Sequence, residues 1–92
     1  MRQCLCIHIT GRVQGVCFRY YAKMEADQLG VTGYTRNLSD GSVEALICGS
    51  VEQLDDMQRW LSHGPEMARV DHVRISKETP EHIPDDFRIA LH

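Results

Sequence analysis

The sequence predicts an α+β protein whose strands and helices follow the order βαββαβ, with one short strand added at the end. Residues 3–10 alternate between apolar and other side chains, and residues 18–29 repeat apolar side chains at helical spacing. Both patterns return in the second half of the chain, at 42–48 and after residue 50. Strands and helices in this order form an antiparallel sheet with both helices on one face.

The first half of the chain contains two strands and a helix. The strand at 3–10 places Leu, Ile and Ile on one side and its two cysteines on the other, as in a strand with one buried face. From Phe18 the spacing becomes helical, and Gly30 is a typical residue for ending a helix. Residues 31–38 are rich in β-branched residues, which favour a second strand.

The next elements are a hairpin, a strand and a helix. The Asp-Gly pair within residues 39–42 favours a tight turn, and residues 42–48 alternate as a third strand. Ser50 and Gln53 have the spacing of a capping box, which marks the start of the second helix. An apolar stripe follows, and the Gly-Pro pair at 64–65 ends the helix.

The last third of the chain predicts two more strands. We expect a fourth strand at about 69–76, with Val73 and Ile75 facing inward. A proline-containing loop at 79–85 follows. Apolar residues then alternate at the end of the chain, at Phe87, Ile89 and Leu91. The whole pattern is that of a ferredoxin-like fold, which we expect to form a single domain over residues 1–92.

Composition excludes several classes of protein. With 42% hydrophobic residues and 25% charged residues, the chain resembles an ordinary globular protein. No apolar run approaches the ~20 residues of a membrane span, and no basic-then-apolar leader opens the chain, so we expect a cytoplasmic monomer without a membrane partner. The net charge of −3 disfavours a nucleic-acid partner, because such surfaces are usually basic.

One edge of the predicted sheet has the features of an anion site. The loop at 11–17 and the end of the second strand at 36–38 both lie at this edge. They are separated by two strand spacings, roughly 10 Å. Gly11 and Gly15 allow backbone conformations in which several N–H groups point inward. The start of the first helix adds its favourable dipole, and Arg19 adds a fork of donors that matches phosphate oxygens.

Local charge supports this interpretation. Residues 11–37 carry four basic and two acidic side chains, a net charge of +2. Since the net charge of the whole chain is −3, the remaining residues have a net charge of −5. The basic side chains are Arg12, Arg19, Lys23 and Arg36. A glycine-rich turn before a helix is nevertheless a weak motif by itself, and from the pattern alone a simple turn stays an open interpretation.

Two motifs resemble those of the acylphosphatase family. They are "GRVQGVCFR" at 11–19 and "GYTRNLSDGSVE" at 33–44, and the similarity extends to "WLSHGP" at 60–65 and to the ending with Phe87 and Ile89. The resemblance covers essentially the whole chain. It implies a ferredoxin-like enzyme that hydrolyses the carboxyl–phosphate bond of acyl phosphates without a metal or other cofactor. Inorganic phosphate would be both product and competitive inhibitor.

The resemblance also implies roles for particular residues. The family's catalytic arginine corresponds to Arg19, and its catalytic asparagine corresponds to Asn37. The backbone of the loop, together with Arg19, would bind the phosphate of the substrate, at Gly15, Val16, Cys17 and Phe18. Asn37, which can donate and accept hydrogen bonds, would orient a water for direct attack on the phosphoryl group.

Two positions bear on how closely the chain follows the family. The family accepts either Gly or Cys at the position of Cys17, so this residue is compatible with the resemblance. Members often have a basic residue directly after the position of Ile89, where this chain has Ala90 and instead has Arg88 directly before Ile89. A subsidiary contact of the site is therefore expected to differ.

The cysteines raise a separate question. Cys4 begins the first strand and Cys48 ends the third, so the two are expected to lie opposite each other on the face without helices, with Cys6 nearby. Under oxidation we predict a Cys4–Cys48 disulfide, whereas a reducing cytosol favours three free thiols. The alternative function is a thiol metal-binding ferredoxin-like module that uses these three residues. The five histidines have no metal-ligand spacing, so we expect no metal site.

Two other domains share this topology. An RNA-binding domain would need aromatic residues on its central strands and a basic sheet face, which this sequence lacks. The amino-terminal domain of the hydrogenase-maturation carbamoyl-transfer proteins also resembles the motif, but the chain ends at His92, which favours the free-standing enzyme. The sequence leaves open which acyl phosphate is the substrate.

Overall fold

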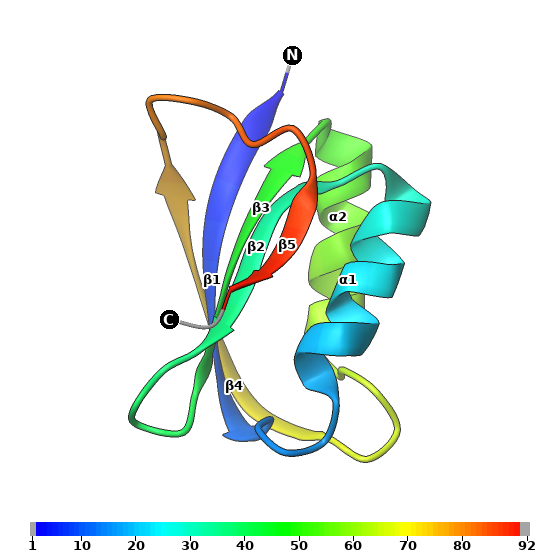
Figure 1. The fold of residues 1–92 in the computed structure, drawn as a ribbon, viewed down its shortest axis with the longest axis vertical. Helices are drawn as coiled ribbons and strands as arrows, with labels where there is room; N and C mark the ends of the chain where they lie inside the picture. The colour runs from blue at the N-terminus through cyan, green and yellow to red at the C-terminus, as the bar shows by residue number, and fades with distance from the viewer. Residues whose placement is uncertain (1, 91–92) are drawn as a thin grey trace.

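The computed structural model describes residues 2–90, in which a five-stranded sheet carries two helices on one face (Figure 1). The elements in chain order are β1 (Gln3–Arg12), α1 (Phe18–Leu29), β2 (Thr32–Asn37), β3 (Val43–Gly49), α2 (Val51–Leu61), β4 (Arg69–Glu78) and β5 (Phe87–Ala90). The strand order β4-β1-β3-β2-β5 confirms the predicted ferredoxin-like fold with its extra strand. The sheet is mixed rather than wholly antiparallel, because β5 pairs with β2 in parallel.

The two helices start and end at the residues that local chemistry favours. Ser50 Oγ accepts a hydrogen bond from Gln53 N, and Gln53 Oε1 accepts one from Ser50 N, which completes the predicted capping box of α2. Gln53 Nε2 also donates to the carbonyl of Leu29, the last residue of α1, at 3.0 Å. The α1 helix ends at Gly30, whose φ of 79° suits glycine. This arrangement fixes one helix against the other.

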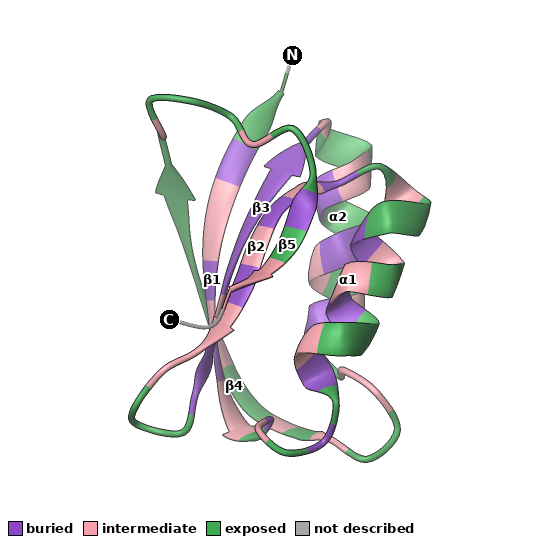
Figure 2. Ribbon diagram, in the orientation of Figure 1, coloured by how far each residue is buried: buried purple, intermediate pink, exposed green. Residues whose placement is uncertain are grey.

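The core lies between the helices and the sheet. Figure 2 shows that both helices turn their buried residues toward the sheet. Of the alternating residues of β1 and β3 that were predicted to face inward, Leu5 is partly buried against the core. The others are fully buried there: Ile7, Ile9, Val43, Ala45 and Ile47. Phe18 packs edge-to-face against Trp60 of α2, with ring centroids 5.6 Å apart. The first turn of α1 is therefore held against the core.

The edge strand β4 differs from the prediction. Val73 is partly buried against the core. Ile75 pairs with the core residue Ile7 and so lies on the predicted face, but it is 48% exposed. The physical reason is the placement of the helices, because α2 packs on β1 and β3, and α1 packs on β2 and β5. No helix among the described residues extends over the far part of β4, which is mostly exposed in Figure 2.

Several boundaries also shift. The connection between β2 and β3 is a five-residue loop, 38–42, rather than a tight turn within residues 39–42, and Leu38 N donates to Ser42 O across it at 2.9 Å. The register of β1 against β4 shifts between Thr10 and Gly11, and β1 continues to Arg12. Leu91, which was predicted in the last strand, lies outside the described residues. Within residues 2–90 no helix has the length and apolar character needed to cross a bilayer.

Candidate active site

A hollow of about 340 Å³ opens where α1 begins and β2 ends. It is lined by Val13, Gln14, Gly15, Cys17, Phe18, Arg19, Tyr20, Asn37 and Ile89. The topology brings these segments to one edge of the sheet because β3 lies between β1 and β2 and is antiparallel to both. Four of the five predicted phosphate-binding residues and the predicted asparagine line the hollow. Val16 instead lines a groove between α1 and α2.

The loop before α1 has an unusual backbone. Gly15 has a φ of 73°, and Cys17, the residue that precedes α1, has a φ of 60°, so both occupy the left-handed region. A Cβ at Gly15 would meet no atom within 4 Å, which shows that the backbone there borders open space. Alternation between left- and right-handed residues is typical of backbones that present successive N–H groups to an anion. The loop is therefore suited to hold a phosphoryl group beside the N-terminus of α1.

Arg19 projects from the first turn of α1 and contacts β5. Its Nη1 donates to the carbonyl of Ala90 at 3.3 Å, which uses one of the five N–H groups of the guanidinium. Arg88 bonds with Asp86 at 3.0 Å and lines a different pocket, so it does not replace the basic residue often found after the position of Ile89. A backbone carbonyl of β5 thus anchors the guanidinium of Arg19.

Asn37 ends β2 with its side-chain oxygen in an unsatisfied state. Oδ1 is buried and has no hydrogen-bond partner among residues 2–90. A buried acceptor without a partner typically costs about 1–3 kcal/mol, so such groups usually need a ligand or an ordered water. Asn37 also lines the hollow, so this unpaired oxygen belongs to a residue at the edge of that space.

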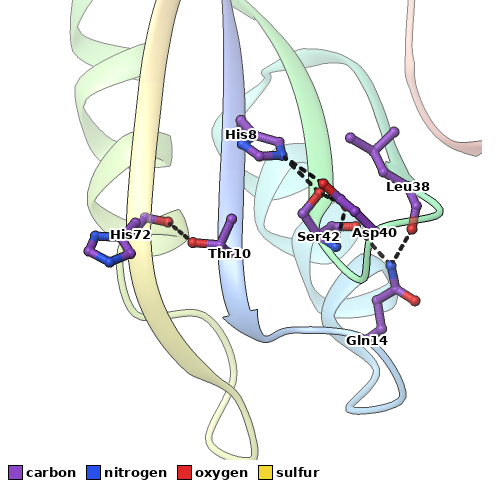
Figure 3. Close-up of polar contacts among 7 residues, drawn as sticks. All are labelled: His8, Thr10, Gln14, Leu38, Asp40, Ser42 and His72. Carbon is purple, nitrogen blue, oxygen red and sulfur yellow. Dashed lines mark hydrogen bonds and ion pairs between the residues drawn. The ribbon is translucent and has the colours of Figure 1, made fainter.

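Gln14 is a site residue that the sequence analysis did not single out. Its Nε2 donates to two carbonyls, of Leu38 and of Ser42, at 2.8 Å each (Figure 3). These carbonyls belong to the first and last residues of the loop that follows Asn37, so Gln14 ties the loop before α1 to the segment that carries the asparagine. A polar side chain directly before Gly15 was the available signal, but the sequence does not specify its partners.

Beyond Gln14, a polar cluster holds the same loop against β1 (Figure 3). Ser42 is 3% exposed, and its hydroxyl donates to Asp40 and lies 2.8 Å from His8 Nε2. The hydrogen bonds from Ser42 hold the pKa of Asp40 below its ordinary value. The side chain of His8 is 29% exposed because it packs against this loop.

The positive charge of the site is smaller than the sequence suggested. Arg36 lies on the opposite face of the sheet, where its Nε donates to Glu44 at 2.9 Å. Lys23 is occupied by Asp27, at 3.0 Å. Among the described residues that line the hollow, Arg19 is the charged side chain. The groups that the hollow offers to an anion are therefore one guanidinium and the loop backbone.

The cysteines lie at the other end of the sheet. Cys4 pairs directly with Cys48 across β1 and β3, with Cα atoms 4.1 Å apart and sulfur atoms in disulfide contact. Burial, together with the nearby negative charges of Glu44 and Glu78, raises the pKa of the Cys6 thiol. Cys48 is five residues from Val43, the end of β3 nearest the hollow, which corresponds to about 17 Å of strand.

Comparison with known proteins identifies the family. The acylphosphatase family model matches residues 5–89. An acylphosphatase of Colwellia psychrerythraea (strain 34H) is 49% identical over 70 residues, which are 76% of this chain and 79% of that protein. The chain belongs to the acylphosphatase family and is an enzyme of that class.

Solved structures agree with this assignment. The structure of an acylphosphatase from Coxiella burnetii matches with a TM-score of 0.90 and 35% identity, and the match covers 97% of this chain and 93% of that one. The crystal structure of acylphosphatase from Bacillus subtilis matches with a TM-score of 0.91 and 32% identity, covering 99% of this chain and 100% of that one. The ferredoxin-like arrangement with the C-terminal strand is thus shared with this family.

Proposed function

We propose that the protein hydrolyses the carboxyl–phosphate bond of acyl phosphates to a carboxylate and inorganic phosphate. The observation that supports this most directly is the hollow at the start of α1. It combines the left-handed loop, the guanidinium of Arg19 and the unsatisfied amide of Asn37, which come from two separate elements. These are groups for binding an anion and for orienting a neutral molecule beside it.

Arg19 and the backbone of 15–19 bind the phosphoryl group in this proposal. Phosphoryl transfer leaves the protein mainly positioning and electrostatic stabilisation to supply, because charge spreads over the equatorial oxygens in the transition state. A planar guanidinium matches two of these oxygens, and its contact with the Ala90 carbonyl limits its freedom before substrate arrives.

Asn37 orients the attacking water. The water oxygen forms a bond to phosphorus as the bond from phosphorus to the acyl oxygen breaks, and the electron pair leaves with the carboxylate. A carboxylate is a good leaving group, so the reaction needs no strong general acid, and the proton of the water passes to phosphate or solvent. The proposed route is direct hydrolysis without a metal, and Cys17 takes no covalent part in it.

The test uses a synthetic aromatic acyl phosphate and the purified protein in the presence of a chelator. We expect the protein to release inorganic phosphate, and added phosphate to inhibit this release competitively. We also expect the active protein to be a monomer in solution. A protein that released no phosphate with or without divalent metals would overturn the proposal. Hydrolysis that depended on added metal would instead contradict the metal-free mechanism and leave the reaction itself in place.

A further inference from the structure

Thr35 carries a hydroxyl that the fold does not use. The side chain is fully buried, and Oγ1 has no hydrogen-bond partner among residues 2–90. A buried hydroxyl normally bonds to a nearby carbonyl or to an ordered water. Valine has nearly the same shape and would fill this position of the core without the cost of an unsatisfied polar group.

Thr35 lies on the same face of β2 as Asn37. Thr35 pairs with Ala45 of β3 and with Ile89 of β5, and Asn37 pairs with Val43 of β3. Ala45 and Val43 both belong to the core under the helices, and Ile89 lines the hollow. Thr35 and Asn37 are therefore successive residues on the helix-covered side of one strand, about 7 Å apart along it.

Two successive residues on one face of β2 thus carry a side-chain oxygen without a hydrogen-bond partner. Among residues 2–90, these two oxygens are the buried side-chain polar atoms that lack a partner. One is Oγ1 of Thr35 and the other is Oδ1 of Asn37. Buried waters typically bridge such groups, since one water makes about three hydrogen bonds to polar atoms that lack other partners. A single water placed between these two oxygens would satisfy both.

We propose that Thr35 is a positioning residue for the reaction and that it acts through a water shared with Asn37 Oδ1. The inference rests on the function proposed above. The amide group is planar, so a hydrogen bond that fixes Oδ1 also fixes the direction of Nδ2. With Oδ1 held on the buried side, Nδ2 is directed into the hollow, where it donates to the attacking water. Thr35 thereby determines which end of the Asn37 amide meets the substrate.

The test compares Thr35→Val with Thr35→Ser and with a matched control on the same strand. Thr35→Val removes the hydroxyl at nearly constant shape, and we expect kcat to fall about tenfold, the effect of one ordinary hydrogen bond, with inhibition by phosphate unchanged. Thr35→Ser keeps the hydroxyl and should retain a kcat close to that of the wild type. Thr32→Val removes a hydroxyl that bonds to Arg2 and should leave kcat unchanged.

A double mutant separates this role from a purely structural one. In an Asn37→Ala background, Thr35→Val should cause no further loss of kcat, because the amide through which it acts is gone. An unchanged kcat in Thr35→Val, or an equal loss in both backgrounds, would overturn the proposal while the function stands. A crystal structure of the wild type gives an independent test: an ordered water bonded to both oxygens supports the inference, and direct bonding of each oxygen to another protein group contradicts it.

Discussion

The two faces of β2 use polar side chains in opposite ways. On the face without helices, Tyr34 and Arg36 both donate to Glu44 Oε1 at 2.9 Å. On the helix-covered face, Thr35 and Asn37 each present an oxygen that has no partner within residues 2–90. Alternate residues of one strand therefore separate polar groups that bond to one another from polar groups that the fold leaves without a partner.

The pKa values reflect the same division. The hydrogen bond from Arg36 holds the pKa of Glu44 below its ordinary value, and burial with the bond to Glu44 raises the pKa of Tyr34 to about 12. Both shifts favour the protonation states present at neutral pH. Removing polar groups from the face without helices should change stability and leave catalysis intact. Removing polar groups from the helix-covered face should lower the catalytic rate and leave stability nearly unchanged.

The largest effect is expected for Arg19→Ala. This change removes the charged side chain that lines the hollow, and arginines that stabilise phosphoryl transfer contribute about 10³-fold or more in rate. We expect kcat/KM to fall by this order and inhibition by phosphate to weaken. Arg19→Lys should be intermediate, since it keeps the charge and loses the bidentate fork. Steady-state kinetics with an acyl phosphate measure both.

Arg36→Ala is the matched control for this comparison. Arg36 lies on the open face and bonds to Glu44, so its loss should leave kcat/KM within about twofold while slightly lowering the midpoint of unfolding. If Arg19→Ala kept its activity and its inhibition by phosphate, the anion would have to bind elsewhere, and the division between the two faces would be wrong.

A somewhat smaller effect is expected for Asn37→Ala. Loss of one group that orients the reacting water typically lowers the rate about 10²–10³-fold. Because the group acts on the water rather than on the phosphate, kcat should fall while KM and phosphate inhibition stay nearly constant. Tyr34 lies three residues before Asn37 on β2 and on the other face, so Tyr34→Phe should keep the kcat of the wild type. A raised KM with an unchanged kcat would assign Asn37 to substrate binding instead.

Periodicity predicted the fold well because it reports which face of an element is apolar. The alternation around Ile7 and the capping pair Ser50 and Gln53 lie where the pattern placed them. Ile75 shows the limit of this reasoning. Its alternation matches that of Val73, but its burial depends on whether a helix reaches the edge strand, which is a property of helix placement and not of the strand's own sequence.

The site was predicted only in part, for a similar reason. The motifs contain Arg19 and Asn37, and the topology brings both to one hollow. The partners of Gln14 depend on the path of the 38–42 loop, which no local pattern specifies. Thr35 looked like an ordinary β-branched strand residue, and its unsatisfied hydroxyl becomes visible only when its surroundings are known.

Oxidation of Cys4 and Cys48 tests the face without helices at the end of the sheet away from the hollow. A Cys4–Cys48 disulfide links residues 44 positions apart and should raise the free energy of unfolding by about 2–4 kcal/mol. Activity should not change, because the pair lies at the end of the sheet away from the hollow. Denaturant unfolding of oxidised and reduced protein measures the gain, and peptide mapping identifies the bond. Cys6→Ala should keep the gain and Cys4→Ala should lose it; mapping that found both cysteines unpaired would reject the bridge.

The smallest effect is expected for Glu44→Gln, which removes the negative charge that accepts hydrogen bonds from Tyr34 and Arg36 on the face without helices. The pKa of Glu44 is lower in the folded protein, so its charge stabilises the fold above the ordinary pKa of about 4.3, and this contribution is lost as pH falls through the folded value. The pair is partly exposed, so we expect a loss below about 1 kcal/mol at pH 7 that shrinks toward pH 3, measured by urea unfolding. Since Glu44 faces away from the hollow, kcat at pH 7 should be unchanged. A large loss of kcat in this variant would show that the two faces of β2 are coupled rather than separate.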